Sequence, residues 1–105
     1  MESIGQRLQR VREASGLGRK VFSELCGLGA SHVRMIETGD VKEPDLKTLR
    51  KIAETAGAEV GWLALGIGDA PDTDAVRTRC AALRAELGAS DEDDDAETDD
   101  AAEAP

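Results

Sequence analysis

The stretch that decides the fold is residues 27–40, GLGASHVRMIETGD. Glycines stand near both of its ends, and between them Val33 and Ile36 recur at the i, i+3 spacing of a helix with one inward face. The pattern predicts a tight turn, a helix over residues 30–37 and a stop at Gly39. The outward positions of that helix would be Ala30, Ser31, His32, Arg34 and Met35.

A second short helix is predicted directly before this turn, over residues 19–26. Its buried stripe would be Val21, Phe22, Leu25 and Cys26. Gly27 can take a positive φ at little steric cost, which lets the two helices meet at a steep angle. Two helices joined in this way are the parts of a helix-turn-helix.

Three more helices are predicted within residues 1–68. The first follows Ser3, which has the spacing of a capping box with Gln6, and ends at Gly16. The next begins at Pro44, and the last covers residues 59–65. The inner face of the helix after Pro44 would comprise Leu46, Leu49, Ile52, Ala53 and Ala56. No alternating β-branched run occurs, so the fold class is predicted to be all-α.

Two segments follow this unit. Residues 72–88 are predicted to form an amphipathic helix, because Val76, Cys80, Leu83 and Leu87 repeat at helical spacing. A helix of about 15 residues is marginal alone in water, so it must pack on its own domain or on a second copy. Residues 89–105 have no apolar face and are expected to be a disordered acidic tail.

Charge is unevenly distributed along the chain. The formal net charge is −9, which alone would disfavour a nucleic-acid partner. Residues 1–68, however, hold ten Lys/Arg and nine Asp/Glu, whereas residues 69–105 hold three and thirteen. The acidity therefore belongs mostly to the tail, and the five-helix unit must be judged without it.

Cysteine content and hydropathy point to a cytoplasmic protein. Cys26 and Cys80 lie on apolar helix faces and are expected to be buried free thiols, as suits a reducing compartment. No apolar run approaches the roughly 20 residues of a membrane span. A single histidine and no nucleophile–base pair or phosphate-binding loop predict that the chain is not an enzyme and holds no metal or cofactor.

A longer series of residues matches one family in order and spacing. The matching residues are Ile4-Gly5-x-Arg7-Leu8, Arg12, Gly16-Leu17, Gly27-Leu28, Val33, Ile36-Glu37-x-Gly39, Pro44, Leu49 and Trp62-Leu63-x-Leu65-Gly66. With these, residues 4–66 resemble a Cro/C1-type helix-turn-helix domain of the XRE family. The resemblance implies a five-helix, lambda-repressor-like fold and binding to double-stranded DNA, with two half-sites for a homodimer.

The resemblance also implies residue roles. Ala30, Ser31 and Met35 would face base edges, and His32 and Arg34 could reach bases or backbone. Arg19, Lys20 and Lys42 would contact phosphates. Apart from the resemblance, the distribution of charge predicts a positive edge that comprises Arg7, Arg10, Arg19, Lys20, Arg34 and Lys42. Arg12 would form a structural ion pair with Glu37, worth several kcal/mol if buried and less than about 1 kcal/mol if exposed.

Some features favour a different partner. The expected reading helix has no Asn or Gln, the residues that match adenine edges, and glycines replace the usual Ser or Thr before both helices of the motif. The alternative is an interaction module that binds a protein, antirepressor-like or antitoxin-like, and no operator. The acidic tail is either a solubilising segment or a tethered polyanion that competes with DNA for the basic face.

Overall fold

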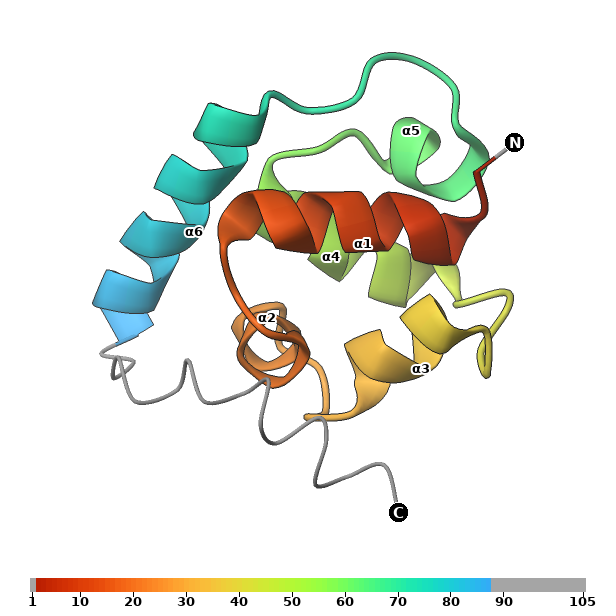
Figure 1. Ribbon diagram of the computed structural model, residues 1–105, viewed down its shortest axis with the longest axis horizontal. Coiled ribbons are helices and arrows are strands. Elements are labelled where there is room, and N and C mark those ends of the chain that lie inside the picture. Colours follow the sequence, from red (N-terminus) through yellow and green to blue (C-terminus); the bar gives the residue numbers. More distant parts are fainter. Residues whose placement is uncertain (1, 88–105) are drawn as a thin grey trace.

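The structure is a computed structural model that describes residues 2–87. Within this range the chain forms six helices and no strand (Figure 1). They are α1 (Ile4–Ser15), α2 (Arg19–Leu25), α3 (His32–Thr38), α4 (Leu46–Ala56), α5 (Val60–Leu65) and α6 (Thr73–Leu87). The predicted all-α class with a helix-turn-helix is confirmed. The acidic tail expected over residues 89–105 lies outside the described residues.

The first helix begins and ends as its sequence predicts. The Ser3 hydroxyl accepts a hydrogen bond from the Gln6 N–H, and the Gln6 side chain accepts one from the Ser3 N–H at 2.8 Å. This reciprocal capping box satisfies two N–H groups that have no partner inside the helix. Gly16 ends α1 with a φ of 79°, a left-handed conformation that glycine adopts at little cost.

Two helix starts differ from the prediction. α3 begins at His32 and not at residue 30, because residues 30 and 31 form a turn closed by a hydrogen bond from the His32 N–H to the Gly29 carbonyl at 3.1 Å. α4 begins at Leu46 and not at Pro44, because the Asp45 carboxylate accepts a hydrogen bond from the Thr48 N–H at 2.8 Å and caps the helix. Hydrogen bonding to Thr48 also lowers the pKa of Asp45.

The core is aliphatic and lies around α1. Figure 1 shows α1 crossing the molecule, with α6 at one side and α3 below it, and α1 packs on α3, α4, α5 and α6. The largest fully buried side chains are Phe22, Leu8, Ile36, Ile52, Leu63, Val11, Val33, Val76 and Cys80. Leu46, which was expected on the inner face of its helix, is 53% exposed, and Leu65 at the end of α5 is 70% exposed. They lie at the ends of short helices, where no neighbouring element covers them.

The last helix folds back onto its own chain. α6 packs against α1 and α4, with Val76 and Cys80 fully buried, while Leu87 at its end is 67% exposed. The Arg79 guanidinium donates a hydrogen bond to the Glu54 carbonyl near the end of α4 at 2.8 Å. The predicted amphipathic helix therefore covers the domain that precedes it.

Both cysteines are buried free thiols, as predicted. Burial raises the pKa of Cys26 to about 12 and that of Cys80 to about 11. Thiols of this kind are unreactive, because the thiolate is the nucleophilic form. Within residues 2–87, no helix has the length and apolar character needed to cross a bilayer.

Candidate nucleic-acid interface

The turn between α2 and α3 is held by a buried serine. Ser23 is fully buried, and its hydroxyl donates to the Gly29 carbonyl and accepts from the Val33 N–H at 3.4 Å. Gly27 takes a φ of 78° inside the turn, as its position predicted. One side chain thus joins α2, the turn and the start of α3. Our sequence reasoning missed Ser23, although a polar residue within an apolar stripe is a detectable signal.

α3 lies unusually close to α1. A Cβ atom added at Gly5 would stand 2.6 Å from the Ile36 carbonyl oxygen, a distance at which backbone must move. Only glycine permits this contact without a shift. The close approach fixes the depth at which α3 sits against the rest of the domain.

A buried carboxylate fixes the end of α3. Glu37 Oε2 lies 2.7 Å from Arg12 Nε, and Glu37 Oε1 lies 3.2 Å from Arg12 Nη2. Arg12 also donates to the Leu17 carbonyl at 3.0 Å. The pair that the resemblance implied is therefore present, and its side chains are only 1% (Glu37) and 11% (Arg12) exposed. Both partners are desolvated, so each depends on the other for its charge balance.

Arg19 joins the same carboxylate. Its Nε atom lies 3.0 Å from Glu37 Oε1, and its side chain is 28% exposed. The resemblance assigned Arg19 to a phosphate, and the structure gives it a protein partner as well. Arg12, Arg19 and Glu37, which we call the Glu37 triad, together carry one net positive charge and link α1, α2 and α3.

The five predicted base-facing residues lie in the turn before α3 and in α3, and the structure brings Ser31, His32 and Met35 together at one hollow, which Ala30 and Arg34 do not line. Ala30 and Ser31 stand in the turn, and His32, Arg34 and Met35 lie within the helix. Met35 is 36% exposed and the other four are partly buried. The residues that line this hollow are Gly29, Ser31, His32, Met35 and Val41. Val41 was not anticipated from sequence, because it belongs to the loop after the helix.

The predicted phosphate ligands are distributed around α3. Lys42 is exposed and lines a second hollow together with Glu37, Thr38 and residues 3–6 of α1 and its cap. Arg19 contacts Glu37, so Arg19 and Lys42 both lie near the end of α3 rather than its start. Lys20 follows Arg19 in the first turn of α2 and is partly buried.

Two arginines that were expected on the positive edge contact other parts of the domain, and one of them, Arg7, is buried. Arg7 is 6% exposed and donates to the Leu63, Ala64 and Glu2 carbonyls at 2.8, 3.1 and 2.7 Å. It thereby satisfies carbonyls at the end of α5 that have no partner within that helix.

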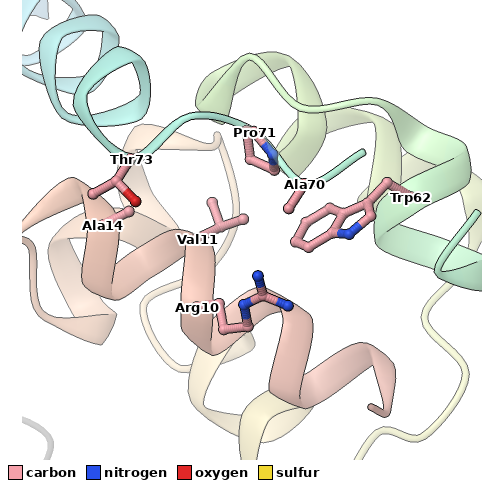
Figure 2. A pocket seen from close by; sticks show the side chains of 7 residues that line it. All are labelled: Arg10, Val11, Ala14, Trp62, Ala70, Pro71 and Thr73. Carbon is pink, nitrogen blue, oxygen red and sulfur yellow. The ribbon is translucent and has the colours of Figure 1, made fainter. Parts of the chain in front are cut away.

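Arg10 lies 2.7 Å from a Glu2 carboxylate oxygen and 5.6 Å from the centre of the Trp62 ring. Figure 2 shows Arg10 and Trp62 at a small pocket between α1, α5 and the α5–α6 connection. Both arginines therefore contact residues of α5; Arg7 is buried, so its assignment to the positive edge was wrong, whereas Arg10 remains exposed beside Glu2.

Comparison with known proteins agrees with this geometry. A protein-family model described as a helix-turn-helix domain matches residues 3–65. An isomerising glutamine–fructose-6-phosphate aminotransferase of Methanocaldococcus jannaschii is 36% identical over 56 residues, which are 53% of this chain and 5% of that enzyme. No solved structure matches. No group of three or more His, Cys, Asp or Glu suited to a metal ion occurs in the described part of the chain. Since the family model spans more than half of the chain, this protein belongs to the helix-turn-helix domain family.

Proposed function

We propose that this chain is a sequence-specific, DNA-binding regulator of transcription, a repressor of the Cro/C1 (XRE) type that reads the major groove with α3. The observation that carries the proposal is the way α3 is held. Its inner side, which includes the buried Val33, is fixed by Gly5, Ser23 and the Glu37 triad, whereas Ser31, His32 and Met35 line a hollow on another side. A helix fixed in this way can enter a groove without losing further conformational freedom.

The proposal assigns roles to the outer side chains. Ala30, Ser31 and Met35 face base edges, and His32 and Arg34 contact bases or backbone. Lys20 and Lys42 bind phosphates as point charges, and Arg19 does so while bonded to Glu37. The few cations available imply modest affinity that depends strongly on salt.

A homodimer is part of the proposal, with half-sites about one helical turn apart. The inner face of α6 is already buried against its own chain, so the dimer contact requires another surface. Leu65 and Ile67, which are 70% and 65% exposed and flank Gly66, are the apolar residues we assign to it. The proposed regulator acts in the cytoplasm and catalyses no reaction.

The test is a binding selection with the full-length chain against a random duplex library at low salt. We expect an enriched palindrome whose half-site spacing reports the dimer. Lys42→Gln should then weaken binding and lower the slope of log K against log salt by about 0.9, the value for one phosphate contact. Arg77→Gln removes the same charge from an exposed position of α6 and should leave the slope unchanged.

One observation favours a second candidate, an interaction module with a protein partner. α3 contains no Asn or Gln, and the hollow beside it is lined by Met35 and Val41. An apolar side chain of another protein could fill such a hollow. If no duplex motif is enriched, the DNA proposal fails and this candidate replaces it.

A further inference from the structure

The hollow on the outer side of α3 is the most specific surface feature of the proposed reader. It measures about 490 Å³, including the part that is open to solvent. Val41 is held over it because the Val41 N–H donates to the Met35 carbonyl at 3.0 Å, which ties the loop to the helix. The Met35 and Val41 side chains therefore form an apolar wall, and the polar groups of Ser31 and His32 stand beside it.

The charge of the lining distinguishes this hollow from its neighbour. No residue that lines it carries a carboxylate, whereas the second hollow, beside Lys42, is lined by Glu37. Glu37 is 1% exposed and bonded to Arg12 and Arg19, so the exposed charge of the second hollow is that of Lys42, which suits a phosphate. The hollow beside Met35 is lined by no Asp, Glu, Lys or Arg, so it suits the neutral edge of a base.

Major-groove chemistry then selects the occupant. Each base pair presents hydrogen-bond donors and acceptors in that groove, and the C5-methyl group of thymine is the apolar group among them. We infer that the hollow receives the C5-methyl of a thymine, and that Met35 and Val41 determine specificity for it. The inference rests on the proposed function, because it requires α3 to lie in the major groove.

The size of the effect follows from the area that one methyl buries. Transfer of one such group from water to an apolar site changes a dissociation constant about fourfold. Ser31 can add a hydrogen bond to a neighbouring base edge, because a hydroxyl both donates and accepts, but this bond does not depend on the methyl group. The methyl contribution can therefore be measured separately.

The experiment uses the full-length chain and the best duplex from the selection. Each thymine is replaced in turn by deoxyuridine, which removes the methyl group and keeps base pairing and every hydrogen-bond group. We expect about fourfold weaker binding at one or more thymines of each half-site. Met35→Ser and Val41→Ser should each reduce this loss, and the double variant should abolish it.

Thr38→Ala is the matched control, because Thr38 lies exposed on α3 and does not line the hollow. It should keep the full difference between thymine and deoxyuridine. Met35 is 36% exposed, so its truncation should leave the fold intact, and the fluorescence of Trp62, the one tryptophan, reports folding in each variant.

The outcomes separate the two proposals. If the chain selects a duplex but binds thymine and deoxyuridine versions equally, the methyl inference is wrong and the proposed function stands. A difference that persists in the double Met35→Ser, Val41→Ser variant also overturns it, because the methyl would then lie elsewhere. If no duplex is selected, both the proposed function and the inference fail.

Discussion

Replacing Glu37 by glutamine should reveal how much of the fold depends on one buried carboxylate. The change keeps the shape of the side chain and removes its charge. In the wild type, Glu37 is 1% exposed and balances Arg12, which is 11% exposed. Glu37→Gln would leave the Arg12 guanidinium desolvated without a counter-charge.

The expected cost follows from burial. Breaking a buried ion pair by removing one partner typically costs about 3–5 kcal/mol. Arg19 is 28% exposed and can turn toward solvent, so the loss of its ion pair with Glu37 should add little to the cost in unfolding free energy. We expect Glu37→Gln to lower the free energy of unfolding by about 3 kcal/mol and Arg19→Met to lower it by less than about 1 kcal/mol. For a small domain with a total of about 5–15 kcal/mol, the first loss is large.

The assay is urea denaturation followed by Trp62, which is 4% exposed in the folded chain and is its one tryptophan. Arg10 and Glu2 supply a matched control, because they lie at the same 2.7 Å but are 52% and 38% exposed. Glu2→Gln should therefore cost less than about 1 kcal/mol. The double variant Arg12→Met, Glu37→Met should recover part of the loss, because neither charge is then stranded.

Two results would refute this reasoning. Equal effects of Glu37→Gln and Glu2→Gln would mean that burial does not decide the strength of these pairs. A double variant that loses as much as the sum of its two single changes would mean that Arg12 and Glu37 act independently, despite their contact.

Three further predictions concern other parts of the chain. Gly5→Ala should destabilise the domain by about 1–3 kcal/mol in urea denaturation, because its Cβ would stand 2.6 Å from the Ile36 carbonyl oxygen; unchanged stability would show that α3 can move away freely. Burial raises the pKa of both Cys26 and Cys80 in the folded chain, so as the pH rises the thiols of the unfolded chain lose their protons before those of the folded chain. The free energy of unfolding should therefore be unaffected by these thiols below about pH 9 and should fall as the pH rises toward 11–12. Cys80→Ala should flatten that fall, and an identical pH profile would contradict the assignment. Removing residues 89–105, which hold nine Asp/Glu and no Lys/Arg, should tighten duplex binding at low salt, as measured by fluorescence anisotropy; equal affinity of the two chains would show that the tail does not compete with DNA.

The local pattern of the chain was sufficient to predict the helices and most of their ends. Apolar spacing located the six helices of residues 2–87 within a few residues. Ser3 and Gly16 marked the limits of α1, because caps act between near neighbours in the chain. The starts of α3 and α4 were predicted less well. At both points several polar or glycine residues compete to begin the helix, and hydrogen bonds to Gly29 and Asp45 decide between them.

The sequence by itself determined the all-α class and the helix-turn-helix, because both depend on short-range spacing. The tertiary structure decided which arginines are engaged by contacts within the chain. Arg7, Arg10 and Arg19 are equivalent in a linear reading, yet they bind α5 carbonyls, Glu2 and Glu37 respectively. It also placed Val41 beside Met35 to complete the hollow. The physical reason is that the contacts of a long arginine side chain, or of a loop residue, depend on which element packs against it. That element can lie more than fifty residues away along the sequence, as Leu63 does from Arg7.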